Sequence, residues 1–148
     1  MGKFIRLHVN RDDDGSGQLF LEFKSGGFSG VGSAYFDLSA LAERVKEFEA
    51  YPLPAQPVSI AGGFLDKSNL SRVREEHLHV SAYPFGPSGR LGLLVKVAEP
   101  VDDGRRDVLR RSASAEFVTD YEQLSLFARE LIELLNGLRE ELTLEFIE

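Results

Sequence analysis

The histidines are the side chains with which this sequence could most readily perform acid–base chemistry or bind a transition metal. His77 and His79 are two residues apart, and His8 lies in a Leu-His-Val triplet like the one that contains His79. Residues at this spacing project from one side of an extended strand, and imidazole is a common zinc ligand. A metal centre would also require the three rings to converge, which this spacing does not specify. We therefore predict no metal site and no cofactor.

Catalysis by a histidine also requires a partner that orients the ring and a group on which it can act. Strand alternation makes Glu22 and Glu116 candidate partners of His79, but no serine or aspartate stands in a recognisable catalytic motif. We therefore predict no catalytic residue and a protein that is not an enzyme. His8, His77 and His79 are assigned to a binding surface instead.

The glycine-rich segment 26–32 resembles a dinucleotide-binding loop in composition only. Such a loop opens directly into a helix that receives the phosphate, whereas residues 33–36 continue a strand pattern. The segment is therefore interpreted as a hairpin turn followed by a strand in which Gly30 and Gly32 mark a bulge.

The single basic cluster, residues 104–111, contains four arginines. Arg110 and its neighbours could hold an anion or an acidic partner. The alternative, a solvated loop balanced by Asp102, Asp103 and Asp107, is favoured.

Composition limits the function classes that remain. The chain has 148 residues, a net charge of −7, 43% hydrophobic residues and no cysteine. These values are typical of one globular domain, residues 1–148, without disulfides or thiol chemistry. An acidic chain argues against nucleic-acid binding, which depends on clustered Lys and Arg. Without a long apolar segment, we expect no membrane span and a cytoplasmic location.

Hydrophobic periodicity predicts the elements that would position these side chains. Alternation at period two indicates strands at residues 5–10, 18–24, 28–36 and 58–64 in the first half. Leu38, Leu41, Val45 and Phe48 have helical spacing after a cap at Asp37 or Ser39. In the second half, an apolar stripe from Leu124 to Leu135 predicts another helix, and Leu142, Leu144 and Phe146 predict a closing strand.

Short matches indicate that the second half repeats the first. Leu7-His8-Val9 recurs 71 positions later as Leu78-His79-Val80, and Ser16 to Leu19 match Ser88 to Leu91 at an offset of 72. Ser33-Ala34-Tyr35-Phe36 matches Ser114-Ala115-Glu116-Phe117 at an offset of 81. The prediction is two βββαβ pseudo-repeats, 1–64 and 75–148, joined by a polar linker at 66–74.

The predicted fold class is α+β. The two repeats are expected to form one mostly antiparallel sheet of about eight strands, with both helices on one face. The uncovered face would then carry a mixture of charged and aromatic residues, including Tyr35, Tyr83 and Arg110 together with the histidines. Such a mixture is typical of an interaction surface.

The layout resembles a known family. Gly27-Phe28-Ser29-Gly30, the helix containing Leu41 and Phe48, and Leu78-His79-Val80 followed by Gly89-x-Leu91 are similar to small bacterial WapI-like immunity proteins and related uncharacterised α+β domains. The resemblance implies a non-enzymatic bacterial protein that binds and neutralises a toxin domain, and it implies no catalytic residue.

The sequence thus favours a protein-interaction domain, with a protein partner or a second copy of the chain bound through His8, His77, His79, Tyr35, Tyr83 and Arg110. Two alternatives remain open. One is a small-ligand or enzymatic site between the repeats, near His8 and His79. The other is a homodimer of structural role, whose interface core would be the aromatic residues of the same face.

Overall fold

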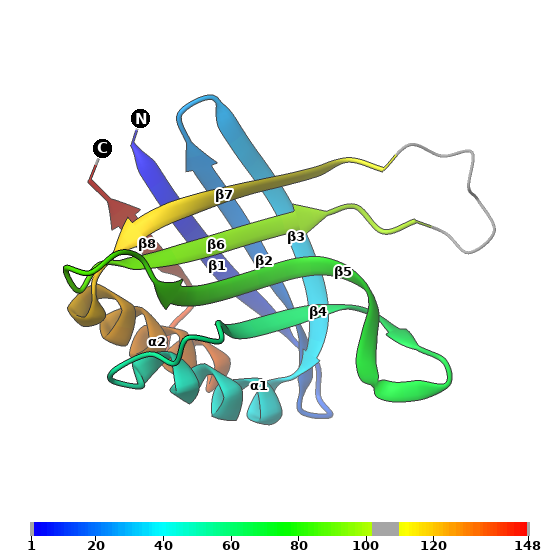
Figure 1. Cartoon of the computed structure of the whole chain (residues 1–148). Helices are drawn as coiled ribbons and strands as arrows, with labels where there is room; N and C mark the ends of the chain where they lie inside the picture. Colours follow the sequence, from blue (N-terminus) through cyan, green and yellow to red (C-terminus); the bar gives the residue numbers. More distant parts are fainter. Residues whose placement is uncertain (1, 102–109, 148) are drawn as a thin grey trace.

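A computed structural model describes residues 2–101 and 110–147 of the chain (Figure 1). The elements, in chain order, are β1 (Lys3–Arg11), β2 (Ser16–Ser25), β3 (Phe28–Asp37), α1 (Leu38–Val45), a 3-10 turn (Lys46–Glu49), β4 (Val58–Asp66), β5 (Asn69–Pro84), β6 (Leu91–Ala98), β7 (Ser112–Thr119), α2 (Tyr121–Leu135) and β8 (Leu142–Phe146).

The strands form two four-stranded sheets instead of one. The first sheet has the order β3-β2-β1-β8 and the second has the order β4-β5-β6-β7, and all neighbouring pairs are antiparallel. The α+β class and the antiparallel pairing are confirmed. The single eight-stranded sheet is wrong, because β4 pairs with β5 and β8 pairs with β1, and no hydrogen-bonded ladder joins the two groups of strands within residues 2–101 and 110–147.

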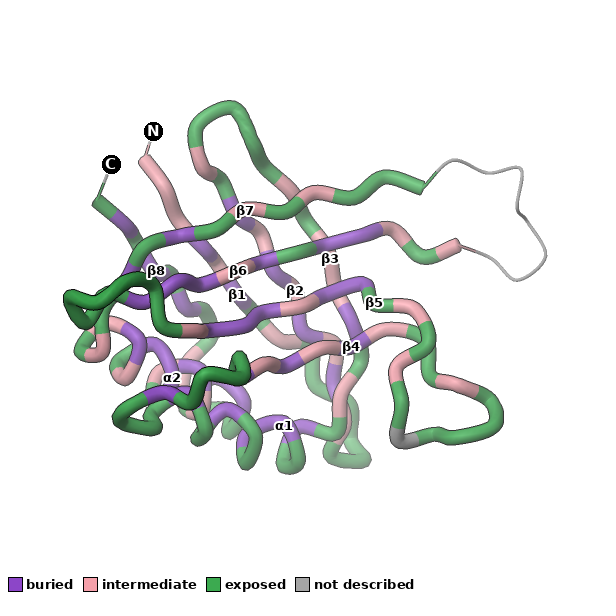
Figure 2. The backbone as a smooth tube through the Cα atoms, viewed as in Figure 1, coloured by how far each residue is buried: buried purple, intermediate pink, exposed green. Residues whose placement is uncertain are grey.

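The two sheets face each other across one hydrophobic core, and their strands run in different directions (Figure 1). Figure 2 shows buried and more exposed positions alternating along several strands, as expected when one face of each sheet is covered. The inner faces are filled by aliphatic residues and by Phe23 and Phe117, whose rings meet edge to face at 6.3 Å. The outer faces therefore lie on opposite sides of the molecule.

Strand β3 passes close to the second sheet, and its glycines permit this approach. A Cβ atom on Gly30 would lie 2.7 Å from Val97 Cγ2, and one on Gly32 would lie 2.7 Å from Val97 Cβ. The pairing of β3 with β2 is continuous from Phe28 to Asp37. The predicted bulge is therefore wrong: these glycines are required for packing between the sheets.

The helices also differ from the prediction in position. Their apolar residues belong to the core between the sheets, and α1 and α2 lie along one side of the sandwich (Figure 1). Asp37 accepts a hydrogen bond from the Ala40 N–H and begins α1, while Asp120 accepts one from Gln123 and begins α2. The helices therefore leave the outer face of each sheet uncovered.

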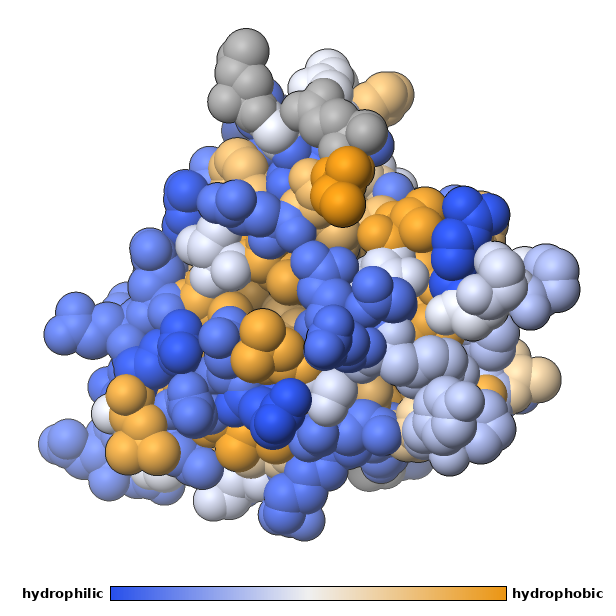
Figure 3. Space-filling model, turned by 90° about the vertical axis from the view of Figure 1, so that its left-hand side faces the viewer, coloured by the Kyte–Doolittle hydropathy of each residue, from blue (hydrophilic) through white to orange (hydrophobic). Residues whose placement is uncertain are grey.

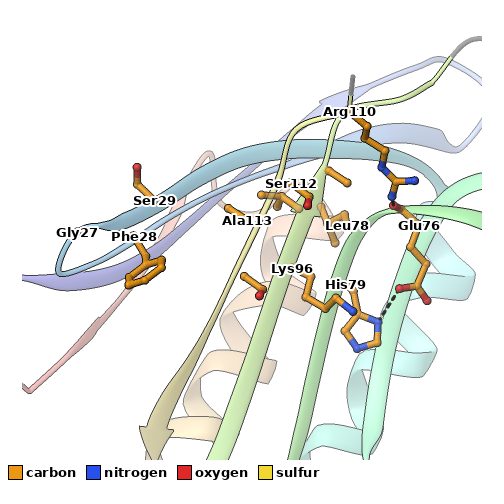
Figure 4. Close-up of a pocket in the computed structure, with 13 residues that line it drawn as sticks. Gly27, Phe28, Ser29, Glu76, Leu78, His79, Lys96, Arg110, Ser112 and Ala113 are labelled. Atoms are coloured by element: carbon orange, nitrogen blue, oxygen red, sulfur yellow. Dashed lines mark hydrogen bonds and ion pairs between the residues drawn. The ribbon is translucent and has the colours of Figure 1, made fainter. Parts of the chain in front are cut away.

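The segment predicted as a polar linker, residues 66–74, forms the end of the β4–β5 hairpin, where Asp66 pairs with Asn69 and Leu65 with Val73. Register shifts after Gly62 and Phe64 interrupt this ladder, and β5 bends away from the body of the sheet there (Figure 1). The bend brings Glu76 to the margin of the second sheet's outer face (Figure 4).

Within residues 2–101 and 110–147, no helix is both long enough and apolar enough to cross a membrane.

Candidate binding groove on the second sheet

A groove with a volume of about 690 Å³ crosses the outer face of the second sheet (Figure 4). We call it the Lys96 groove, and define it by Phe28, Glu76, His79, Lys96, Arg110, Ser112 and Ser114 among its lining residues. Strand register explains why these side chains meet. His79 pairs with Lys96 on β6, and Lys96 pairs with Ser114 on β7, so all three project from the same face in one row.

The groove is hollow because long and short side chains stand side by side. Ala98, Ser112 and Ser114 provide only small side chains next to Lys96. At one end stands Phe28, the first residue of β3, which is 69% exposed. Arg110 stands at another margin, beside Glu76 (Figure 4). The groove therefore combines an exposed aromatic ring with basic side chains over a floor of hydroxyl and methyl groups.

The charged groups of the Lys96 groove are unevenly paired. His79 Nδ1 lies 3.2 Å from Glu76 Oε1, without the alignment of a hydrogen bond, and Arg110 donates to the backbone oxygen of Glu76 at 3.1 Å. Lys96 is exposed and has no carboxylate partner within the described residues. The groove thus presents an unpaired cation in a chain whose net charge is −7.

This arrangement is suited to holding an anionic group, because ammonium, guanidinium and hydroxyl groups can all donate hydrogen bonds to carboxylate oxygens. It is not arranged for nucleophilic catalysis. In the part of the chain that the structure describes, neither Ser112 nor Ser114 hydrogen-bonds to His79, and activation of a serine requires such a base.

His77 lies outside the groove, in a buried pair with Glu75. Its Nε2 atom is 2.5 Å from Glu75 Oε2, and the Val101 N–H donates to the same oxygen at 3.1 Å. The ring of Phe64 meets the imidazole edge to face at 4.6 Å. His77 therefore joins the bent part of β5 to the segment that follows β6, and its role is positional.

Several effects act on the Glu75 carboxylate. Burial by itself would raise its pKa. The hydrogen bonds from His77 and from the Val101 N–H, together with the positive charges of His77 and Arg110, outweigh burial and hold the pKa of Glu75 below the ordinary value for glutamate.

Tyr83 shares the outer face with the Lys96 groove but is further along β5. Its ring lies over Gly92, where a Cβ atom would collide with it, and its hydroxyl donates to Glu116. Burial of the phenol and this hydrogen bond raise the pKa of Tyr83 above the ordinary range for tyrosine. Glu116 is therefore engaged by Tyr83 and not by His79.

His8 and Tyr35 lie on the opposite side of the molecule. His8 stacks on Phe20 with ring centroids 4.6 Å apart and an interplanar angle of 6°, and Tyr35, on the edge strand β3, is 65% exposed. Glu22, also on this face, pairs with Arg6 at 3.1 Å. The alternative of one site near His8 and His79 is contradicted, because β1 and β5 belong to different sheets. The two candidate partners of His79 are engaged elsewhere, Glu22 by Arg6 and Glu116 by Tyr83.

Of the six predicted binding residues, His79 and Arg110 line the Lys96 groove. Phe28 and Glu76 were not predicted. The sequence offers one indication for Phe28, because it is an aromatic residue in a glycine-rich segment where exposure is expected. Glu76 reaches the groove only because β5 bends. Of the predicted basic cluster, Arg111 pairs with Glu99, while Arg105, Arg106 and the three aspartates at 102, 103 and 107 lie outside the described residues.

A second hollow, of about 680 Å³, lies between α2 and the end of β7. Its exposed apolar residues are Val118, Leu126 and Ile147, and they are interspersed with Arg90 and Arg129. Figure 3 shows this side of the molecule, where apolar residues stand among hydrophilic ones without forming a continuous patch. It is a weaker candidate than the Lys96 groove.

No group of three or more potential metal ligands occurs among the residues that the structure describes. Comparison of the chain with protein-family models, with curated proteins and with solved structures gives no match.

Proposed function

We propose that this protein is a non-enzymatic protein-interaction domain that binds its partner on the outer face of the second sheet. One observation carries the proposal: an unpaired lysine and a highly exposed phenylalanine border the same groove, on a sheet face that neither α1 nor α2 covers (Figure 1). Aromatic residues and arginine are enriched in protein interfaces, and Phe28 and Arg110 both line this groove.

The form of the groove favours a protein partner over a small molecule. Its lining includes the short side chains of Ser112, Ser114 and Ala98 on the sheet surface. Small-molecule sites, in contrast, usually enclose most of the ligand within apolar walls. The volume of about 690 Å³ would also admit a small anion, which is the second candidate.

The toxin-neutralising role implied by the resemblance to WapI-like immunity proteins is one specific form of this proposal. An acidic chain is compatible with a basic toxin overall, whereas the groove is locally basic. The contact would therefore involve an acidic segment of the partner.

We also infer that the two halves are repeats. The ladders place His8, Phe20 and Ser33 in one row and His79, Lys96 and Ser114 in another. Superposing the rows aligns His8 with His79 and Ser33 with Ser114, which are two of the matches in the sequence. The same superposition aligns Phe20 with Lys96, which is an offset of 76 positions. The match of residues 16–19 to 88–91 has an offset of 72, so it is displaced by four positions from the structural alignment and does not support the repeat.

Affinity capture from lysate of the source organism, followed by binding measurements with the purified captured protein, tests the proposed function. The bait variants are Lys96→Glu and a matched control, Lys24→Glu, which changes an exposed lysine on the outer face of the first sheet. We expect Lys96→Glu to weaken binding and Lys24→Glu to leave it unchanged. Equal binding by both variants, or loss with Lys24→Glu alone, would contradict the proposed surface.

A further inference from the structure

The outer edge of β7 borders the Lys96 groove and is unpaired. β7 is the last strand of the second sheet, and within the described residues no strand pairs with it on the side away from β6 (Figure 1). An edge strand presents a row of backbone N–H and C=O groups that can pair with another extended segment. Folded proteins commonly block such an edge with Pro or Lys, and β7 contains neither.

We propose that this edge and the Lys96 groove together bind an extended acidic segment of a partner protein, which pairs with β7 as an added strand. The inference rests on the proposed function and specifies the class of partner and the manner of binding.

Charge complementarity determines the chemistry of the segment. The outward side chains of β7 are Ser112, Ser114, Glu116 and Val118. On an added strand, the side chains opposite Ser112 and Ser114 would stand about 5 Å from them. Because these serines are short, Lys96 can extend past them toward the added strand, which lies about 10 Å from β6. Arg110 approaches from the end of the row. Aspartate or glutamate is therefore favoured opposite Ser112 or Ser114.

The other half of the strand sets the opposite preference. A carboxylate opposite Glu116 would face a like charge, and Val118 is 50% exposed, so a basic or apolar residue is favoured there. Phe28, which is 69% exposed near the Ser112 end, offers a contact for an apolar side chain. The expected ligand is thus acidic at one end and basic or apolar at the other, with outward side chains at every second position.

Selection from a random 12-residue peptide library tests this arrangement, with the wild-type protein, Lys96→Glu and Lys24→Glu as baits. The wild type and Lys24→Glu should enrich peptides with Asp or Glu at alternate positions. Lys96→Glu should lose this preference, and its affinity for a selected acidic peptide should fall by roughly fivefold or more, since an attraction is replaced by a repulsion.

Backbone pairing is tested separately by N-methylation of each amide of the selected peptide. An added strand donates alternate N–H groups to β7, so methylation at alternate positions should weaken binding by on the order of tenfold, while methylation between them should have little effect. Spectra of ¹⁵N-labelled protein should show changes along β7.

Any of the following results would overturn the inference. In the selection, they are no enriched peptide, enrichment of peptides without acidic residues, or the same preference with all three baits. In the binding measurements, they are free glutamate bound as tightly as the peptide, or peptide affinity that does not change on N-methylation. The two proposals fail in distinguishable ways. A captured partner that is lost with Lys96→Glu, combined with indifference to N-methylation, would leave the proposed function intact and remove only the added strand.

Discussion

On the outer face of each sheet, a histidine heads a row of three paired residues that ends in a serine, but the residue in the middle of the row differs. On the first sheet, His8 pairs with Phe20 and stacks on it at 4.6 Å. On the second sheet, His79 pairs with Lys96, and the row continues to a serine on both sheets. Phe20 stacks on the imidazole of His8, which remains exposed and lines a separate hollow, whereas His79 is half-buried beside Lys96 and lines the Lys96 groove. The residue on the adjacent strand therefore sets the chemistry beside each histidine, an aromatic ring on the first sheet and a cation on the second.

Phe36 and Phe117, which the proposed repeat would align, are packed differently, and this difference should have the largest effect on stability. Phe117 is 2% exposed and contacts both Phe23 and Phe146, while Phe36 is only partly buried. We expect Phe117→Ala to lower the free energy of unfolding by about 3 to 5 kcal/mol, and Phe36→Ala to lower it clearly less. Urea denaturation of both variants measures this. Equal losses would mean that the two halves contribute alike to the core.

β3 and β7 are both edge strands, but only β3 has glycines whose backbone lies directly against a strand of the other sheet. β3 lies against the second sheet, and Gly32→Ala would force Val97 to move, because the new Cβ would lie 2.7 Å from it. We expect a loss of about 1 to 3 kcal/mol from overpacking, measured by thermal and urea denaturation.

Gly27→Ala is the matched control for Gly32→Ala, since no atom lies within 4 Å of the added methyl group. A Gly32→Ala variant as stable as Gly27→Ala would show that β3 does not pack closely on β6.

The ion pairs Glu75–His77 and Glu22–Arg6 differ in how far they are exposed to solvent. Glu75 is largely buried with His77, whereas Glu22 and Arg6 are 45% and 40% exposed. We expect Glu75→Gln to cost about 1 to 2 kcal/mol near neutral pH, because it weakens buried hydrogen bonds to a charged group. Glu22→Gln should cost about 0 to 1 kcal/mol, as for other exposed pairs.

The pH dependence of unfolding adds a second measurement. The pKa of Glu75 is lower in the folded protein than its ordinary value. Its contribution to stability is therefore complete above the unfolded-state pKa and is lost as pH falls through the folded-state pKa. Stability of the wild type should consequently fall more steeply below the ordinary glutamate pKa than that of Glu75→Gln. Parallel curves would show that the His77–Glu75 pair does not form in solution.

The smallest expected effect is at Tyr83, away from the Lys96 groove. Tyr83→Phe removes the hydrogen bond to Glu116 and should cost about 0.5 to 1.5 kcal/mol. It should also remove the component of an alkaline absorbance titration at the highest pH, since the pKa of Tyr83 is raised. The preference for an acidic residue opposite Ser112 or Ser114 should persist in Tyr83→Phe, and its loss would indicate that Tyr83 also shapes that end of the binding surface.

Local patterns predicted most of the elements. Alternation placed Ile5, Leu7, Leu19 and Leu21 inward, and all four are buried; an aspartate cap correctly marked the start of α1. The binding surface was only partly predictable. His79 and Arg110 were identified by residue type, but Glu76 reaches His79 through a bend in β5 that follows register shifts with β4, and no local pattern specifies such a bend.

The sequence by itself determined which side of each strand faces the core, because side chains alternate along any extended backbone and apolar ones are removed from water. It could not determine which strands share a sheet. That choice depends on pairing between residues far apart in the chain, such as β8 with β1, and on the close approach of β3 to β6 at Gly30 and Gly32. Only the tertiary structure therefore separated His8 from His79 onto opposite faces and placed Lys96, His79 and Phe28 around one groove.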